Sequence, residues 1–225
     1  MKTIVKVIAA IAVFGGGFFA YQSVNAADIT GDAGVSYSDT RTFRGVKQAD
    51  DTLGVNVGLG TSLAEKVSLG VSLDSFTALE AGQTNELRTG VSVGYDVSET
   101  IGLSVGYTNY DYQSATSADE IGFGVSVETV LSPSVLYATD SDNDSDVTEL
   151  SVCHELSLSE QFGLTLCGSL GNVDAAADYT YHSIGATVTS SLGGADTFAG
   201  VALVDNDNAG SDSETVFSVG LSLSF

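Results

Sequence analysis

The cationic side chains of this chain gather in one short segment. Three of its seven Lys and Arg residues, Arg41, Arg44 and Lys47, fall close together. Such side chains pair with carboxylates and phosphates. This segment either folds into an opening and pairs with acids there, which would narrow the opening, or contacts lipid phosphates, or caps a rim.

Acidic side chains dominate the rest of the chain, with 29 Asp and Glu residues and a formal net charge of −22. So few cations leave no basic surface for a nucleic acid. Two acidic stretches carry oxygen ligands of the kind that Ca²⁺ and Mg²⁺ prefer, but neither has the glycine and glutamate spacing of an EF-hand. We predict no dedicated metal site and no cofactor, and leave open that these stretches bridge divalent cations to an anionic membrane. They contain Asp140, Asp142, Asp144 and Asp146, and then Asp205, Asp207 and Asp212.

The two cysteines lie on either side of a tight turn. A hairpin centred on Glu160 places Cys153 opposite Cys167. In an oxidising compartment such a pair forms a disulfide, and a metal site would need further thiols or a nearby inward-facing histidine. We therefore predict a disulfide between them.

The two histidines do not form a catalytic group. His154 alternates in phase with Val152 and Leu156, and His182 shares a face with Ile184. Neither presents a nucleophile, a base and an orienting group together. We predict no catalytic residues and no enzymatic activity, and a membrane hydrolase is the least favoured alternative.

The chain begins with an export signal. Lys2 and Lys6 precede an apolar run over 7–20 that Gly15, Gly16 and Gly17 interrupt, and small residues surround Ala26. This pattern predicts a signal peptide over 1–26, cleaved after Ala26, and a single domain over 27–225.

The mature chain reads as a series of strands, because apolar residues recur at every second position. The clearest case is the last stretch, where Phe217, Val219, Leu221, Leu223 and Phe225 alternate with Ser and Gly. The other face carries mainly Gly, Ser, Thr and acids, which would make a poor core. With the apolar face toward lipid, the pattern predicts a single all-β, antiparallel transmembrane barrel. We expect twelve strands, at 28–38, 52–63, 66–77, 86–97, 100–112, 119–130, 133–141, 147–158, 161–173, 179–191, 196–205 and 213–225.

The connections and aromatic residues predict how this barrel lies in the membrane. Tight connections alternate with longer ones, which indicates short periplasmic turns and modest outer loops. Aromatic residues then fall into two girdles at the membrane interfaces. We place Tyr37, Phe76, Tyr107, Tyr137, Tyr179, Tyr181 and Phe217 in the outer girdle, and Tyr95, Phe162 and Phe225 in the inner one.

The alternate positions of each predicted strand that face the interior of the barrel form the candidate pore lining. Most of these positions hold Gly, Ser or Thr, which leave room for water, and the loops are too short to form a large plug. Five acids against one base favour cations over anions, unless the acids lie only at the rims. These inward charges are Asp74, Arg88, Asp96, Glu128, Glu149 and Glu155.

One segment suggests a family. The stretch over 38–48, which contains Phe43, Arg44 and Gly45, resembles the Phe-Arg-Gly motif of the TorF-like porin family, and weaker similarity covers nearly the whole mature chain. This resemblance implies a Gram-negative outer-membrane β-barrel of the porin type. It does not indicate which solute the barrel passes. The terminal Phe225 is similar to the sorting signal that the outer-membrane insertion machinery reads.

The sequence thus predicts a porin of the bacterial outer membrane that passes small hydrophilic solutes by diffusion, with cation preference. The alternative is a non-conducting structural or surface-interaction barrel that binds divalent cations and lipopolysaccharide. The expected partners are the lipid bilayer, lipopolysaccharide, the insertion machinery and small solutes. The oligomeric state stays open.

Overall fold

The computed structural model describes residues 29–113, 117–208 and 210–225, so the predicted signal peptide lies outside the described residues. The described chain forms twelve strands and, within those ranges, no helix long and apolar enough to cross a membrane. The strands are β1 (Ile29–Phe43), β2 (Val46–Ala64), β3 (Val67–Ala78), β4 (Glu86–Asp96), β5 (Ile101–Tyr112), β6 (Ala118–Val127), β7 (Ser134–Asp140), β8 (Ser145–Ser157), β9 (Phe162–Asp174), β10 (Tyr179–Leu192), β11 (Ala195–Asn206) and β12 (Glu214–Ser224).

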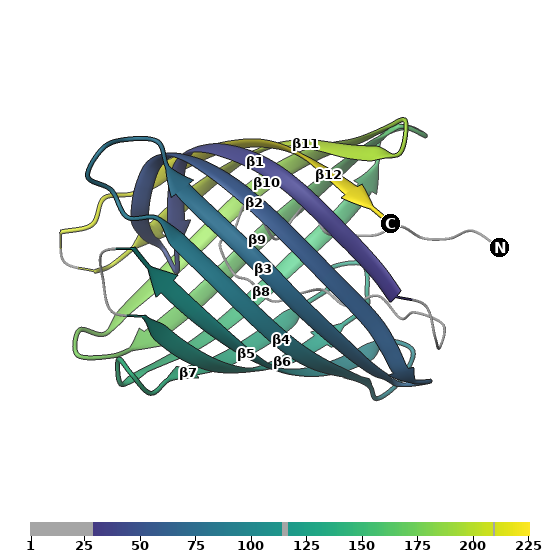
Figure 1. Cartoon of the computed structure of the whole chain (residues 1–225), viewed down its shortest axis with the longest axis horizontal. Helices are drawn as coiled ribbons and strands as arrows, with labels where there is room; N and C mark the ends of the chain where they lie inside the picture. The colour runs from purple at the N-terminus through teal and green to yellow at the C-terminus, as the bar shows by residue number, and fades with distance from the viewer. Residues whose placement is uncertain (1–28, 114–116, 209) are drawn as a thin grey trace.

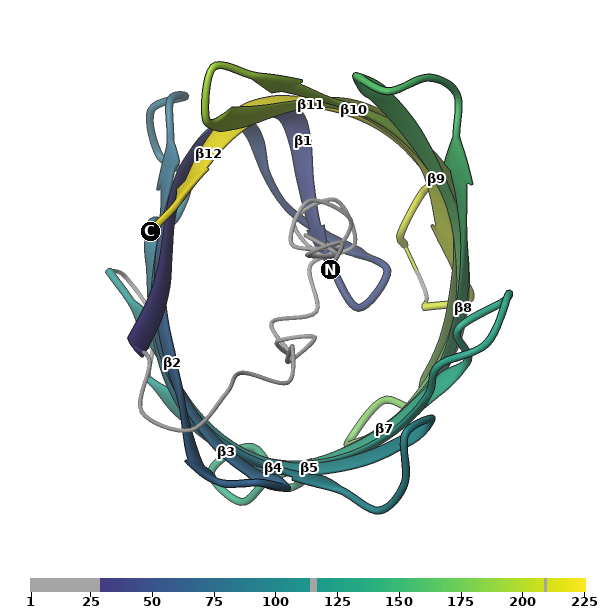
Figure 2. The same ribbon diagram turned by 90° about the vertical axis from the view of Figure 1, so that its right-hand side faces the viewer.

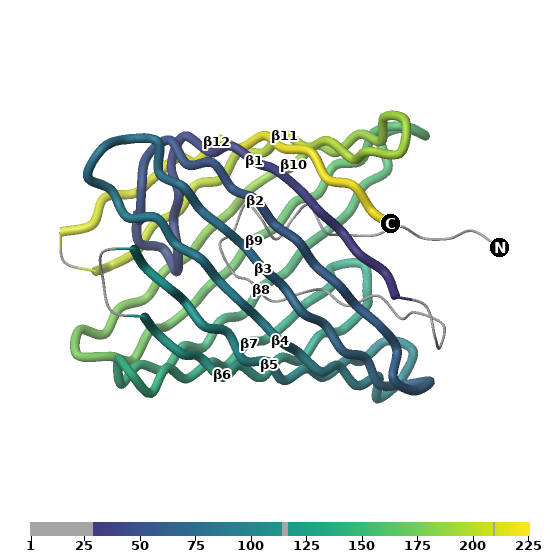
Figure 3. Tube along the Cα trace, in the orientation of Figure 1, coloured from purple at the N-terminus to yellow at the C-terminus, as the bar shows by residue number. Residues whose placement is uncertain are grey.

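The strands form one closed antiparallel barrel (Figure 1). Each strand pairs with its neighbours in sequence, and β1 closes the barrel by pairing with β12, where Val35 lies opposite Leu221. All strands are strongly tilted, as the tube view shows (Figure 3). The end that carries Ile29 and Phe225 is called the terminal end below, and the opposite end, which carries the β1–β2 turn, is called the loop end.

The two faces of the wall differ as the alternation predicts. Large apolar side chains point outward, so Val55 is 43% exposed and Phe123 51% exposed. On the inner face, small and polar residues such as Ser72 and Ser92 occupy the alternate positions. Because an apolar exterior is unfavourable in water and favourable in lipid, the predicted all-β transmembrane barrel of twelve strands is confirmed.

Ten of the twelve predicted strands match within about three residues, the usual uncertainty of such boundaries. The larger differences lie in β1 and β2. Their segment over 39–51 was expected to be a loop, but both strands continue through it and meet at a two-residue turn, Arg44–Gly45. In this segment β1 and β2 pair with each other across a short turn, so both strands continue beyond the barrel wall.

The aromatic girdles are only partly as predicted. Tyr37, Tyr107 and Tyr137 do lie on the outer face near the loop end. Phe76, Tyr179 and Tyr181 instead face the lumen: Tyr181 is only 3% exposed, and an arginine stacks on Phe76. Whether an aromatic side chain faces lipid or the lumen therefore depends on its odd or even position in the strand. Its distance from the end of the strand does not decide this.

Candidate functional site

The end of the β1–β2 hairpin lies inside the barrel. Figure 2, a view along the barrel, shows this blue-purple hairpin within the ring of strands. Arg44 and Gly45 form its turn with positive φ angles of 49° and 79°, the left-handed conformation that two-residue hairpin turns require. A Cβ at position 45 would lie 2.4 Å from the Cβ of Tyr181, so only glycine fits here against β10. Residues 40–50 are called the hairpin tip below.

The hairpin tip places arginines among buried glutamates. The Arg41 guanidinium donates to Glu86 Oε2 at 2.5 Å, while Arg88 Nε donates to the other oxygen of the same carboxylate. Arg44 pairs with Glu120, whose second oxygen accepts a hydrogen bond from Tyr110 at 3.3 Å. Charge-assisted bonds of this kind are strong when water is excluded.

Aromatic rings cover the three guanidinium groups. The Arg41 guanidinium lies 4.2 Å from the centre of the Phe76 ring, and that of Arg44 lies 4.6 Å from the Phe43 ring. Arg88 lies 4.5 Å from the Phe43 ring and 5.0 Å from that of Tyr110. Cation–π contact adds to the ion pairs and fixes the planes of the arginines.

The hairpin tip also contacts the wall on the β12 side of β1, at β10 and β11. Asn206, at the end of β11, donates to the carbonyl of Gly45 at 2.7 Å. Beside it, the Tyr181 hydroxyl of β10 donates to Glu149 Oε2 at 2.5 Å. The tip therefore contacts β3, β4, β5, β6, β10, β11 and β12. The expectation that the loops are too short to form a large plug did not foresee this tip, because the extended strands supply the length that the two-residue turn lacks.

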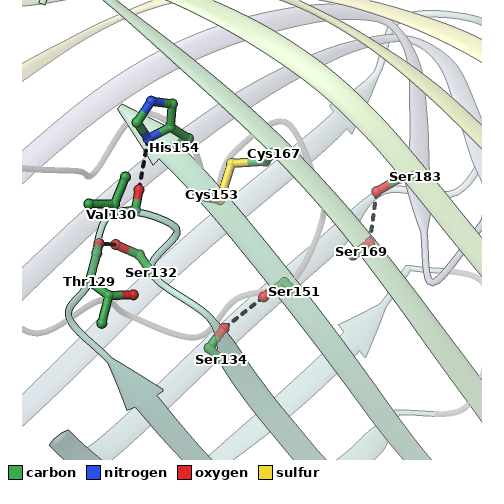
Figure 4. The surroundings of a disulfide bond; sticks show 10 residues. All are labelled: Thr129, Val130, Ser132, Ser134, Ser151, Cys153, His154, Cys167, Ser169 and Ser183. Carbon is green, nitrogen blue, oxygen red and sulfur yellow. Dashed lines mark hydrogen bonds between the residues drawn. A yellow bond between two sulfur atoms is a disulfide. The ribbon is translucent and has the colours of Figure 1, made fainter. Parts of the chain in front are cut away.

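The lumen toward the terminal end has a different lining. Small residues predominate, and Ser134, Ser151, Ser169 and Ser183 form one row across four neighbouring strands. The hydroxyl groups of Ser134 and Ser151 form a hydrogen bond with an Oγ–Oγ distance of 2.7 Å (Figure 4). Those of Ser169 and Ser183 form another, also at 2.7 Å. Hydroxyl groups leave space for water and exchange hydrogen bonds with it.

The disulfide lies beside this row. Cys153 and Cys167 are directly opposite in the β8–β9 register and are bonded to each other, as the sequence predicts (Figure 4). Their phase places them on the inner face. The bond joins strands that the hairpin turn already brings together.

The predicted charged residues lie in four places. Arg41, Arg44, Arg88 and Glu149 lie in or beside the cluster around the hairpin tip. Asp74 lies on the inner face, directly opposite Arg88 in the β3–β4 register. Lys47 lies at the rim and pairs with Asp50 at 2.5 Å. Asp96 ends β4, Glu155 lies near the end of β8, and Glu128 lies in the turn after β6, so these three are at the terminal end.

Glu86 and Glu120 were missing from the predicted set, although they are 3% and 4% exposed at the centre of the cluster. The signal was present: Glu86 is two residues before Arg88 and so shares its face. Both lie within the predicted strands 86–97 and 119–130, on the inward phase, so the same count along the strand that selected Arg88 would have selected them.

Neither histidine takes part in this site. His154 lies on the outer face, where its Nδ1 bonds to the carbonyl of Val130 at 2.7 Å in the turn before β7 (Figure 4). His182 is also on the outer face, 3.9 Å from Asp205. Within the described ranges, no group of three or more His, Cys, Asp or Glu residues is arranged to hold a metal ion.

The fold and the apolar exterior define the class: this is a β-barrel of the outer-membrane type. Solved structures of this architecture are similar to it. The KdgM porin has a TM-score of 0.57 at 11% identity, covering 87% of this chain and 99% of KdgM. The COG4313 outer-membrane channel from Pseudomonas putida F1 has a TM-score of 0.58 at 8% identity, covering 92% of this chain and 98% of the channel.

A protein of another kind shares the fold. LpxR from Salmonella typhimurium, a hydrolase, has a TM-score of 0.55 at 8% identity, covering 85% of this chain and 99% of LpxR. No family model and no curated protein matches the sequence. The comparisons therefore establish the fold, and the TorF-like resemblance stays a prediction.

Proposed function

We propose that this protein is a porin of the Gram-negative outer membrane that passes small hydrophilic solutes by diffusion along their gradients, without a cofactor. The observation that carries the proposal is the inner wall toward the terminal end, where Gly, Ser and Thr line a closed barrel whose exterior is apolar. Short polar side chains leave room for water. The similarity in fold to KdgM and the COG4313 channel supports it.

Cation preference follows from which charges are neutralised. The lumenal arginines Arg41 and Arg44 are each paired with a carboxylate. Asp96 and Glu155, at the terminal end, have no ion-pair partner among the described residues. Unpaired carboxylates along a water-filled path attract cations and repel anions.

The test is a planar-bilayer recording of the refolded mature protein in asymmetric KCl. We expect discrete openings and a reversal potential on the cation-selective side. The variant Asp74→Asn, Asp96→Asn, Glu155→Gln should shift that potential toward zero. A matched control removes three acids from the loops, with Asp142→Asn, Asp144→Asn and Asp212→Asn, and should shift it less. Equal shifts in the two variants would contradict the assignment of selectivity to the lumen.

We propose that the loop end faces outward and the terminal end faces the periplasm, with the bilayer and lipopolysaccharide as lipid partners. Phe225 is 70% exposed at the end of the seam, and its backbone pairs with Gly31 in both directions. This exposure suits its proposed role as the sorting signal. Replacing Phe225 with Ala should reduce the amount of barrel in outer-membrane fractions, and unchanged amounts would contradict that role.

One observation favours a second candidate, the non-conducting barrel that binds divalent cations and lipopolysaccharide. The hairpin tip contacts seven strands and crosses the lumen. A folded barrel that never conducts, but whose thermal stability rises with Mg²⁺ and lipopolysaccharide, would replace the porin proposal with this one. Nothing among the described residues favours a hydrolase.

A further inference from the structure

The hairpin tip has no strand neighbours other than its own two arms. The pairing of β1 with β12 ends at Ser38, opposite Ser218. The pairing of β2 with β3 begins at Thr52, opposite Ala78. Between these points, residues 40–50 pair only with one another. An isolated two-stranded ribbon is marginally stable at best, so side-chain contacts must hold the tip in its place.

The backbone is irregular where the tip leaves the wall. The β1–β2 pairing runs without interruption up to Ser38 and Thr52, omits Asp39 and Asp51, and resumes at Thr40 and Asp50. Asp51 has a positive φ angle of 44°, a conformation that aspartate tolerates better than most residues. A second irregularity separates Arg41 from Thr42. The register shift between Arg41 and Thr42 bends the strand pair and increases its twist, while the unchanged register across Asp39 and Asp51 leaves these two residues outside the ladder.

The base of the tip is anchored to the wall on both sides. Asp39 accepts a hydrogen bond from the backbone N–H of Phe217 at 2.8 Å. On the other arm, Gln83 donates to Asp50 at 3.2 Å and accepts from its backbone N–H at 2.8 Å. The base is thus fixed at the rim, while the far end is held only by its contacts across the lumen.

The contacts across the lumen are of two kinds. The ion pairs Arg41–Glu86 and Arg44–Glu120, and the hydrogen bond from Asn206 to Gly45, can be replaced by water. The ring contacts of Arg41 with Phe76, and of Phe43 with Arg88 and Tyr110, cannot. In the tip itself, only Phe43, Val46 and Ala49 are apolar. When the tip leaves the lumen, water solvates its charged and polar side chains, and the loss of the ring contacts of Arg41 and Phe43 opposes opening.

From these observations we propose that the hairpin tip is a gate. It rotates about the irregular segment at Asp39 and Asp51 between the position seen here, across the lumen, and an open position outside the loop end. The Arg44–Glu120 pair is the latch that holds the closed position. This proposal rests on the proposed porin function, since a gate needs a conducting path to close.

The first experiment separates the gate from the pore. A variant in which residues 40–50 are replaced by Asn-Gly joins Asp39 to Asp51 through a turn that favours hairpins. Its folding is checked by heat-modifiable gel mobility and circular dichroism. We expect this variant to conduct steadily at one high level, and the intact protein to switch between that level and a lower one. A folded tip-less variant that does not conduct would overturn the porin function. A steady low level in the intact protein, with a conducting tip-less variant, would overturn only the gate.

The second experiment tests the latch. Glu120→Gln should raise the open fraction about tenfold, which corresponds to a weakening of the closed position by about 1.4 kcal/mol. The matched control Lys66→Gln removes one charge from the turn at the terminal end and should leave the open fraction unchanged. An unchanged open fraction in Glu120→Gln would contradict the latch.

The third experiment holds the gate closed. In the double variant Arg44→Cys, Glu120→Cys, a short bifunctional thiol reagent links the tip to β6. We expect the linked protein to remain at the low level and the unlinked double variant to open more often than the intact protein. The single variant Arg44→Cys, treated with the same reagent, is the control. Openings to the high level in the linked protein would overturn the gate.

Discussion

The two halves of the lumen are built on opposite principles. Toward the loop end, buried arginines, glutamates and aromatic rings fill the space and hold one another in fixed positions. Toward the terminal end, a row of serines and scattered acids line the wall without closing it. The same twelve strands support both halves, so the difference arises from the side chains and from one hairpin that bends inward.

The difference shows how a barrel divides its tasks along its length. A paired, desolvated cluster is costly to disturb because each charge depends on its partner. A wall of short polar residues depends on no single contact and tolerates water at every position. We therefore expect substitutions in the loop-end half to change stability and gating, and those in the terminal-end half to change selectivity.

The largest effect should come from Glu86→Gln. This carboxylate holds both Arg41 and Arg88, and Arg88 belongs to the wall strand β4, so it cannot leave the lumen with the hairpin tip. Removing one partner of a buried pair should lower the free energy of unfolding by about 3 kcal/mol. Urea unfolding in lipid vesicles measures this loss. The control Asp96→Asn, at the terminal end, should cost about 0.5 kcal/mol or less. Similar losses in the two variants would remove the contrast between the halves.

A smaller effect is expected from removing the disulfide. Cys153→Ser together with Cys167→Ser opens a covalent loop with a sequence separation of 14 residues. The chain-entropy account predicts a loss of about 3 kcal/mol, and we expect about 2 kcal/mol because the hairpin already joins the two strands. Conductance and selectivity should not change. Altered conductance in the folded variant would show that the terminal-end wall is not independent of this link.

The smallest effect concerns an exposed contact at the loop end. The Asp207 carboxylate accepts hydrogen bonds from the Thr180 backbone N–H at 2.6 Å and from its hydroxyl at 2.8 Å, which lowers the pKa of Asp207 below its ordinary value. A lowered pKa stabilises the folded protein above the unfolded pKa of about 4, and this contribution is lost as the pH falls through the lower folded value. Asp207→Ala should therefore be less stable than the intact protein at about pH 6 and equally stable well below about pH 3. A stability difference that persists in acid would contradict the assigned cause.

The sequence was sufficient for the barrel and insufficient for the cluster. Period-two alternation in segments such as Phe217–Phe225 is a local property, so strand number, faces and the Cys153–Cys167 pairing followed from counting along the chain. The cluster joins Arg44 to Glu120 and Gly45 to Asn206, across sequence separations of 76 and 161 residues. Such contacts depend on the direction in which one hairpin bends. The concentration of cations over 41–47 indicated a constriction as one alternative, but it did not identify the glutamates.

The seam between β1 and β12 gives the assembly of this barrel an order. Asn206 reaches Gly45 only when the first and last strands have met, because these two residues lie near opposite ends of the chain. Contacts between residues far apart in sequence form late in folding. The ion pairs of the tip with Glu86 and Glu120 join strands β1 to β6 and need no seam, so they can form before the ring closes. The contact of the tip with β11 is therefore expected to form last, and a fluorescent label at position 206 should report that step.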